Sequence, residues 1–280
     1  MTQAKSQPHD GAIIQVERFR AAYGGKTVLQ DVNFDVNRGE VLVLAGGSGC
    51  GKSTVLKHMI GLYQPADGRI LIDGEDIAAS SGADRERILR KFGVAFQGGA
   101  LFGNMSVLEN VRLPMEEYTD LSREMMDMVA LTKLRLVSLE HAAQKLPAEL
   151  SGGMQKRAAI ARAMSLDPAI VFLDEPSAGL DPITSADLDE LIVDLNAMLN
   201  MTFVVVTHEL PSIFRIADRV VVLDAAVKTM VALDSPDKLR DSHPNPWVHS
   251  FFNREASTSQ EPLAAAASAH AAPVKNGGRV

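Results

Sequence analysis

Apolar and polar side chains alternate along the first part of the chain. This alternation over residues 13–19 and 28–36 predicts two strands, each with one buried face, with a turn at Gly24 and Gly25 between them. The continuous apolar run over residues 41–45 predicts a third strand that is buried on both faces. A glycine-rich turn and a helical pattern over residues 52–62 follow. A strand, a glycine loop and a helix in this order begin a mononucleotide-binding unit.

The middle of the chain has a helical pattern. Helix-forming residues dominate from 107 to 164, and we interpret the apolar stripe of Met125, Met126, Val129 and Leu136 as core packing rather than as a cofactor site. Strand and helix patterns then alternate over 170–173, 185–199, 203–206, 211–216 and 220–223. The sequence therefore predicts an α/β fold with an α-helical subdomain, at about 98–165, inserted into it.

The last residues differ in composition from the rest. From residue 257 onward the chain is rich in Ala, Ser, Pro and Gly and has no aromatic residue. We therefore expect one domain over 11–253 and a flexible Ala-rich tail over 254–280. A helix over 264–272 is an alternative for part of the tail, but it is too short to be stable alone.

Composition argues against several classes of protein. The 280 residues include 28 Lys and Arg against 35 Asp and Glu, and the net charge of −7 argues against nucleic-acid binding through bulk positive charge. The single cysteine, Cys50, excludes an internal disulfide and a cysteine-based zinc site within one chain. Residues 1–10 are polar and unlike a signal peptide, and no apolar run approaches the roughly 20 residues of a membrane helix. We expect any work at a membrane to depend on a partner's helices.

Residues 46–53 match the phosphate-loop pattern G-x-x-x-x-G-K-[ST]. The glycines allow backbone N–H groups to surround phosphate oxygens, and the helix that follows adds the positive end of its dipole. Lys52 supplies positive charge for the β- and γ-phosphates, and the Ser53 hydroxyl is placed to bind Mg²⁺. We interpret Cys50 as a small filler of the loop rather than as a redox switch. The predicted nucleotide-binding residues here are Gly46, Gly47, Ser48, Gly49, Cys50, Gly51, Lys52, Ser53 and Thr54.

A second candidate for the same site is the apolar strand at 170–173, which is followed by Asp174 and Glu175. The strand delivers both carboxylates at its C-terminal end, where ligands bind in open α/β sheets. Asp174 is expected to bind Mg²⁺, and Glu175 is expected to act as the general base on an attacking water.

Further motifs resemble those of ABC transporter ATPase subunits. Residues 150–155 (Leu-Ser-Gly-Gly-Met-Gln) are similar to the signature motif of this family, and residues 177–181 are similar to its D-loop. Gln97 and His208 fit the family's order of motifs, and Tyr23 resembles the aromatic residue that stacks on adenine. The resemblance covers roughly residues 13–235. It implies a P-loop NTPase core with an antiparallel β subdomain and an inserted α-helical subdomain.

The resemblance also implies ATP and Mg²⁺ as ligands and ATP hydrolysis as the reaction. Gln97 follows a predicted strand at 93–96 and is expected to reach the metal and the attacking water, and His208 ends the strand at 203–207 and is expected to contact the γ-phosphate. The implied catalytic residues are Glu175, His208 and Gln97, and the implied metal-binding residues are Ser53, Gln97 and Asp174.

The signature residues have a physical role of their own. Ser151 is a good N-cap, and the free N–H groups at the start of the helical pattern after it form an anion site. In the family, such a site binds the γ-phosphate held by the opposite subunit, which implies this role for Ser151, Gly152 and Gly153. Tyr23 and Asp181 complete the implied nucleotide site.

Residues 57–62, 96–107 and 153–157, together with 246–248 and 251–252, are similar to the ATPase subunits of Mce/Mla-type lipid transport systems. This similarity implies a homodimer at the cytoplasmic face of the bacterial inner membrane. Its partners would be a permease that docks near Gln97 and Phe102, an Mce-type lipid-binding protein and a small accessory subunit. Gly98 and Gly99 depart from the pattern because a bulkier polar residue is common there, and the tail has no counterpart.

Three hypotheses about function are carried forward. The first is an ATP-driven lipid transport subunit, and the second is the corresponding subunit for another solute, such as an amino acid importer. The third is a soluble ABC ATPase of translation or DNA repair, which the single ATPase cassette and the absence of a heptad insert disfavour. Trp247, Phe251 and Phe252 are expected to pack either on the partner subunit or on their own domain.

Overall fold

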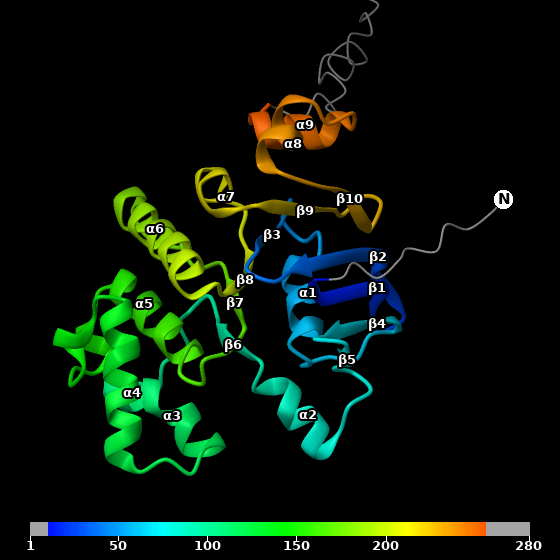
Figure 1. Cartoon of the computed structure of the whole chain (residues 1–280). Helices are drawn as coiled ribbons and strands as arrows, with labels where there is room; N and C mark the ends of the chain where they lie inside the picture. Colours follow the sequence, from blue (N-terminus) through cyan, green and yellow to red (C-terminus); the bar gives the residue numbers. More distant parts are fainter. Residues whose placement is uncertain (1–10, 256–280) are drawn as a thin grey trace, which may run out of the picture.

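An antiparallel sheet forms the first layer in the computed structural model, which describes residues 11–255 (Figure 1). Its strand order is β2–β1–β4–β5. Strands β1 (Ala12–Tyr23) and β2 (Lys26–Asn37) confirm the first two predicted strands and extend beyond them at both ends. The sequence patterns did not identify β4 (Asp67–Ile72) or the short β5 (Glu75–Asp76).

A second sheet has six strands in the order β10–β9–β3–β8–β7–β6. The strands β3 (Val41–Gly46), β6 (Phe92–Ala95), β7 (Ile170–Asp174), β8 (Thr202–Val206) and β9 (Arg219–Asp224) run parallel, and β10 (Thr229–Asp234) pairs antiparallel with β9. All five parallel strands were predicted, and β10 was not. Their C-terminal ends share one edge of the sheet, which is where ligands bind in this class of fold.

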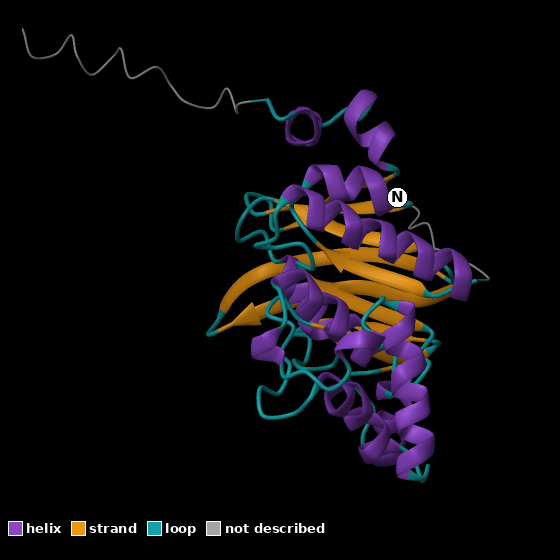
Figure 2. Cartoon of the chain, turned by 90° about the vertical axis from the view of Figure 1, so that its left-hand side faces the viewer, coloured by secondary structure: helices purple, strands orange, loops and turns teal. Residues whose placement is uncertain are grey.

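Two hydrophobic cores lie on the two faces of this sheet, and β3 contributes alternate residues to each. Val43 faces the core that includes α6 (Pro182–Leu199), α7 (Leu210–Ile216) and the helices between residues 107 and 163. Leu42 and Leu44 face the core that α1 (Lys52–Met59) shares with the antiparallel sheet. Because side chains alternate along a strand, a run that is apolar at every position is required to fill both cores. Figure 2 shows helices lying against the strands.

The helical group contains α3 (Val107–Tyr118), α4 (Arg123–Leu136) and α5 (Gly152–Ala163), and 3₁₀ turns lie at Glu140–Ala142 and Pro147–Glu149. Serine side chains cap the N-termini of all three helices. The expectation that Met125 packs in the core is wrong, because this side chain is 50% exposed. The buried stripe of α4 is Met126, Ala130 and Leu134, which are spaced four residues apart and so share one face of the helix.

The helix predicted at 52–62 ends earlier than expected, at Met59. Three short helices were not predicted: α2 (Gly82–Leu89), α8 (Pro236–Asp241) and α9 (Pro246–Asn253). On α9, Phe252 is buried in the domain's own core, and Trp247 and Phe251 pack against that core while half-buried. The tail from residue 257 and the helix considered at 264–272 lie outside the described residues.

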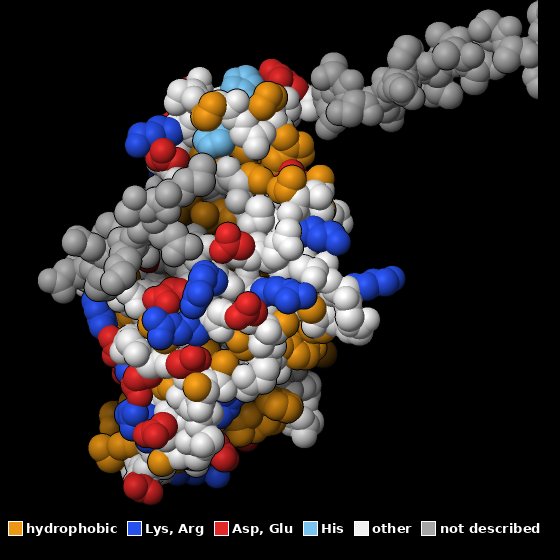
Figure 3. All heavy atoms as spheres, turned by 90° about the vertical axis from the view of Figure 1, so that its right-hand side faces the viewer, with side chains coloured by type: hydrophobic (Ala, Val, Ile, Leu, Met, Phe, Trp, Pro, Cys, Tyr) orange, Lys and Arg blue, Asp and Glu red, His pale blue; other side chains and the backbone are white. Residues whose placement is uncertain are grey.

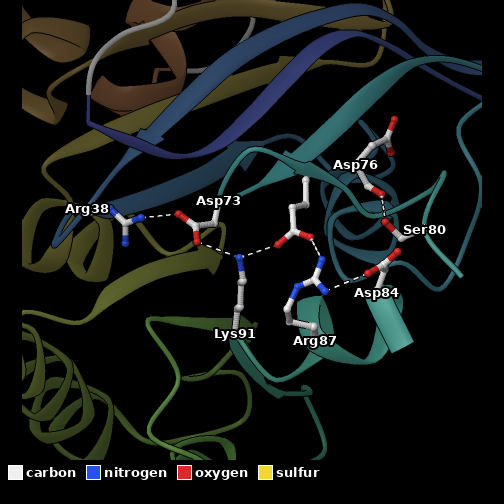
Figure 4. Close-up of polar contacts among 8 residues, drawn as sticks. Arg38, Asp73, Asp76, Ser80, Asp84, Arg87 and Lys91 are labelled. Atoms are coloured by element: carbon white, nitrogen blue, oxygen red, sulfur yellow. Dashed lines mark hydrogen bonds and ion pairs between the residues drawn. The ribbon is translucent and has the colours of Figure 1, made fainter. Parts of the chain in front are cut away.

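An ion-pair network attaches the turn between β4 and β5 to the neighbouring elements (Figure 4). Lys91, just before β6, donates to Asp73 and Glu75, with N–O distances of 2.8 Å to both. Arg38 also binds Asp73, and Arg87 on α2 also binds Glu75. The bonds from Arg87 and Lys91 lower the pKa of Glu75 to about 2. The network thereby anchors the start of β6, the strand that leads to Gln97.

Acidic and basic side chains are interspersed across the face of the molecule that Figure 3 shows. Such mixing agrees with a net charge that is only moderately negative, −7 over 280 residues. Within residues 11–255, no helix has both the length and the apolarity that crossing a bilayer requires.

Candidate functional site

The phosphate loop joins β3 to α1, and its backbone conformation requires glycine. Gly46, Gly49 and Gly51 have φ values of 141°, 74° and 106°. A Cβ atom at Gly46 would lie 2.3 Å from the carbonyl oxygen of Leu223 on β9. No side chain caps the N-terminus of α1, so its first N–H groups are available to a bound anion.

Lys52 lies at the start of α1 with its ammonium group held over the loop. Its Nζ donates to the carbonyl oxygens of Gly46 at 2.9 Å and Gly47 at 3.2 Å. These bonds hold a positive charge beside the uncapped N-terminus of α1, an arrangement suited to phosphate oxygens.

A cavity of about 620 Å³ opens above this loop. Two residues that were not predicted as nucleotide-binding, Val28 of β2 and Phe251 of α9, also form its wall. The predicted site residues that line the cavity lie at or after the C-terminal ends of four parallel strands: Gly46, Gly47, Ser48, Gly49, Gly51, Lys52, Ser53, Thr54, Gln97, Glu175 and His208. The sheet edge therefore brings together the phosphate loop and the three predicted catalytic residues.

Glu175 and His208 are paired at the mouth of β7 and β8. The His208 Nδ1 atom lies 2.9 Å from Glu175 Oε1, and the Glu175 N–H donates to the Val206 carbonyl at 2.8 Å. The backbone of Glu175 has a φ of 48°, a strained conformation for a residue with a side chain. Glu175 Oε2 is buried and has no protein partner. One carboxylate oxygen is thus oriented by histidine, while the other contacts no protein donor.

Ser53 and Asp174 supply two oxygen ligands next to Glu175. The Ser53 hydroxyl donates to Asp174 Oδ1 at 3.4 Å. Burial and the neighbouring negative charge of Glu175 raise the pKa of Asp174. A hydroxyl and a carboxylate are ligands that Mg²⁺ prefers, and a divalent cation would offset the repulsion between the two carboxylates. The residues present therefore fit the predicted metal.

Lys156 connects the parts of the site, and it was not predicted as a site residue. Its Nζ, on α5, donates to the backbone carbonyl of Gln97 and to that of Glu175, the latter at 3.3 Å. Burial lowers the pKa of Lys156. The sequence did offer a signal: Lys156 lies one turn after the start of the helix that begins in the signature motif, on the side that faces the sheet edge.

The predicted signature residues and Asp181 are not part of the cavity lining. Ser151 caps α5 by accepting a hydrogen bond from the Met154 N–H at 3.3 Å. A Cβ atom at Gly153 would lie 2.5 Å from the Thr184 side chain on α6. Asp181 caps α6 by accepting from the N–H groups of Ile183 and Thr184, both at 3.1 Å. The starts of α5 and α6 thus lie side by side, and nucleotide contacts by these residues stay a prediction.

Tyr23 and Cys50 also lie outside the cavity lining. Tyr23 is 42% exposed at the end of β1, and partial burial raises its pKa more than a hydrogen bond with the Thr54 side chain lowers it. Cys50 is 1% exposed, and burial raises the pKa of its thiol. A buried thiol with a raised pKa is unreactive, which supports the interpretation of Cys50 as a filler.

Asp189 lies on α6, and its carboxyl group is buried between α6 and α7. Helix α7 is the one that follows His208. Its Oδ1 atom has no partner, and burial raises its pKa from 3.8 to about 6. Glu209 and Glu190 also raise this pKa, while Ser212 and Arg215 oppose them. Asp189 therefore binds its proton more tightly in the folded chain than in the unfolded chain. The protonated carboxyl stabilises the folded chain fully below about pH 4, and this stabilisation is lost as the pH rises through about 6.

We expect Asp189→Asn to raise the free energy of unfolding at pH 7.5 by about 1–3 kcal/mol, because the substitution removes the cost of a buried charge. The gain should vanish at pH 4, where Asp189 is protonated in the folded chain. Urea unfolding at the two pH values measures the difference. An equal effect at pH 4 and pH 7.5 would show that the Asp189 charge is not responsible.

A known protein family matches the part of the chain that contains most of the predicted site residues. Residues 29–178 match the family model described as ABC transporter. The chain belongs to the ABC transporter family. It is an ABC ATPase, and its phosphate loop, Gln97, signature motif and Asp174–Glu175 pair all fall within the matched segment.

Two relatives are about equally similar to this ABC ATPase. The "probable ribonucleotide transport ATP-binding protein mkl" of Mycobacterium leprae (strain TN) is 40% identical over 243 residues, which are 87% of this chain and 69% of the relative. The "intermembrane phospholipid transport system ATP-binding protein MlaF" of Escherichia coli (strain K12) is 40% identical over 230 residues, 82% of this chain and 84% of the relative.

Solved structures of ABC ATPases share the fold. The cbiO1 protein of Clostridium perfringens, part of the ABC transporter complex cbiONQ, is 29% identical with a TM-score of 0.75, covering 82% of this chain and 90% of that one. MJ0796, a bacterial ABC transporter cassette solved as a dimer, is 32% identical with a TM-score of 0.72, covering 79% of this chain and 98% of that one. The predicted P-loop NTPase fold with an antiparallel sheet and a helical group is confirmed.

Proposed function

We propose that this chain is the ATP-hydrolysing subunit of a transporter that moves phospholipid between bacterial membranes. The observation that carries the hydrolytic part is the single cavity that holds the phosphate loop together with the paired Glu175 and His208. The observation that favours lipid as cargo is the 40% identity to the phospholipid transport relative, which extends over 82% of this chain.

The residues that line the cavity, together with Asp174 beside Ser53, have separate tasks in this proposal. The phosphate loop and Lys52 bind the phosphates of ATP, and Ser53, Gln97 and Asp174 hold Mg²⁺. When bound, Mg²⁺ neutralises charge on the phosphates. Glu175 accepts the proton of the attacking water through its free Oε2, and His208 orients Glu175 through Oε1.

A second copy of the chain completes the site. Ser151, Gly152 and Gly153 do not line their own cavity, so they are available to the nucleotide held by another copy. The N-terminal N–H groups of α5 provide the anion-binding end of a helix for that contact. A related ABC cassette has been solved as a dimer, which supports a homodimer here. In this arrangement Asp181 lies beside the signature of its own chain and faces the partner.

The permease is proposed to dock beside the loop that follows β6. Phe102 is exposed there, and Arg162 of α5 donates to the carbonyl oxygens of Gly99 at 2.9 Å and Ala100 at 2.7 Å. A cavity of about 170 Å³ next to this loop is lined by Phe92, Pro114, Tyr118 and Arg162, among others. A permease helix bound there would shift the loop that follows β6, and Gln97 would move with this loop.

The remaining partners and boundaries are part of the same proposal. They comprise an Mce-type lipid-binding protein and a small accessory subunit, with the complex placed at the cytoplasmic face of the inner membrane. Within the chain we propose an ATPase domain over 11–253, with its helical subdomain at about 98–165, followed by the tail. No nucleic-acid partner is proposed.

Purification of the chain with its membrane partners, followed by mass spectrometry of the bound lipids, tests the cargo. We expect phospholipid in stoichiometric amounts and stimulation of ATP hydrolysis when the complex is placed in bilayers. A complex that carries no lipid and whose hydrolysis responds to ribonucleotide or amino acid would instead support transport of another solute. The mkl relative, described as a ribonucleotide transport protein, makes ribonucleotide the first alternative to test.

A further inference from the structure

Lys156 is a cation on α5 that contacts the backbone of two residues lining the catalytic cavity. Its Nζ donates to the carbonyl oxygen of Gln97, which follows β6, and to that of Glu175, which follows β7, the latter at 3.3 Å. The two carbonyl groups belong to loops that lie far apart in the sequence. A single ammonium group on a third element therefore joins them.

The surroundings of this ammonium group are unfavourable for a contact that serves stability alone. The side chain is partly buried, and within residues 11–255 its hydrogen bonds go to carbonyl oxygens rather than to a carboxylate. Burial lowers the pKa of Lys156, and the negative charges of Glu175 and Asp174 oppose this effect. Because a cation removed from water without a directly paired carboxylate adds little to stability, the contact indicates a role in the site.

The peptide group that Lys156 binds belongs to a strained residue. Glu175 has a φ of 48°, in the left-handed region, and such a conformation persists only where the surroundings hold it. The Glu175 N–H donates to the carbonyl of Val206 at 2.8 Å, and the Glu175 carbonyl accepts from the Ala178 N–H at 3.2 Å as well as from Lys156. Val206 ends β8 and Ala178 belongs to the same turn as Glu175, whereas Lys156 holds this peptide from a separate helix.

The conformation of this peptide determines where the Glu175 carboxylate lies. Its Oε1 is 2.9 Å from His208 Nδ1, and its Oε2 is buried with no protein partner. The Cα–Cβ bond turns with the backbone, so relaxation of Glu175 to a negative φ would move the whole side chain. The carboxylate would then leave His208 and its position in the wall of the cavity.

The other contact of Lys156 fixes its ammonium group in place. The Gln97 carbonyl belongs to the loop after β6, and this loop is held to α5 a second time by Arg162, which donates to the carbonyl oxygens of Gly99 at 2.9 Å and Ala100 at 2.7 Å. Two cations of α5 therefore bind the loop along its length. The ammonium group of Lys156 extends this attachment to the peptide after β7.

We propose that Lys156 is a positioning residue for ATP hydrolysis, which holds the Glu175 peptide in its strained conformation and uses the Gln97 carbonyl as a second anchor. This inference rests on the proposed ATPase function. Lys156 does not itself line the cavity, so its effect on the reaction passes through Glu175. The residue is accordingly expected to support the rate of hydrolysis rather than the binding of ATP, which the phosphate loop provides.

Lys156→Met removes the charge and both hydrogen bonds while keeping a long side chain. In steady-state assays of the full chain with Mg²⁺, we expect kcat to fall about 10- to 30-fold and KM for ATP to stay within about 2-fold. Lys156→Arg keeps a cationic donor and should keep kcat within about 3-fold of the unaltered chain.

Arg157→Met is the matched control. Arg157 is the next residue on α5 and also donates to two backbone carbonyl groups, those of Val137 and Asp187, neither of which lines the cavity. Its kcat should stay within about 2-fold of the unaltered chain. A normal kcat for Lys156→Met, or equal losses for Lys156→Met and Arg157→Met, would overturn the inference.

A second measurement tests whether Lys156 acts through Glu175. In a chain that already carries Glu175→Gln, Lys156→Met should change the single-turnover rate of phosphate release by less than about 2-fold, because the base that Lys156 positions is gone. The same fold loss with and without Glu175→Gln would contradict the inference and would indicate a general structural defect. An unaltered chain that hydrolyses no ATP would overturn the proposed function as well.

Discussion

Glu175→Gln is expected to reduce ATP hydrolysis by at least about 100-fold while leaving ATP binding intact. An amide has nearly the same shape as the carboxylate but cannot accept the proton of an attacking water, and general base catalysis contributes about 10²–10⁴-fold. The buried Oε2 of Glu175, which has no protein partner, is the atom whose chemistry the substitution removes. Release of phosphate measures the rate, and calorimetry with ATP measures binding.

The same variant should accumulate as a dimer in ATP, because the closed pair can no longer hydrolyse the nucleotide at its interface. Size-exclusion chromatography with light scattering, with and without ATP, detects this change in mass. Glu117→Gln, an exposed position on α3 outside the cavity, is the control and should hydrolyse ATP at the normal rate. Normal turnover by Glu175→Gln would eliminate Glu175 as the general base and would direct attention to His208.

Gly93→Ala is expected to cause the second large effect, on stability. Gly93 lies in β6, and a Cβ atom there would lie 1.8 Å from the carbonyl oxygen of Ala163, at the end of α5. The atoms that a Cβ at Gly93 would meet are backbone atoms of Ala163, which cannot rotate away, so α5 and β6 must move apart. Overpacking of this kind costs about 1–3 kcal/mol and occasionally more. For a domain of this size, 3 kcal/mol corresponds to a fall in Tm of roughly 6–12 °C.

This displacement should also reduce activity, because α5 carries Lys156, which binds the carbonyl oxygens of Gln97 and Glu175. Gly98→Ala is the matched control: no atom lies within 4 Å of a Cβ atom at that position, which is also in the loop after β6. It should leave the Tm within about 1 °C of the unaltered chain. Equal melting temperatures for the two variants, measured by calorimetry, would contradict the close contact between β6 and α5.

The sequence predicted the glycine loop between β3 and α1 because its parts are local. The spacing from Gly46 to Ser53 dictates both the glycine backbone and the side chains that follow it. The carboxylates after β7 were also predictable, because an apolar run that ends in Asp174 and Glu175 places them at a strand end. Since parallel strands end at one edge, the joint location of Gln97, Glu175 and His208 followed once their strands were identified.

Contacts between distant segments were beyond the sequence patterns. Lys156 meets Gln97 across 59 residues, and the ion pairs of Asp73 and Glu75 involve three separate elements. β5 has only two residues, which is too short for a period, and β10 has no alternating burial. Met125 was misassigned because the phase of a helix relative to its core depends on its neighbours.

The sequence by itself therefore determined the fold class, the strands of the parallel sheet and the glycine loop that joins β3 to α1. Local backbone geometry and hydrophobic periodicity are properties of contiguous residues, so they can be predicted from the order of residues. The tertiary structure alone decided that the signature residues lie beside α6 rather than in their own cavity, and that Lys156 binds the carbonyl oxygens of Gln97 and Glu175. These are contacts between segments far apart in the chain, and they depend on how packed elements fit in three dimensions.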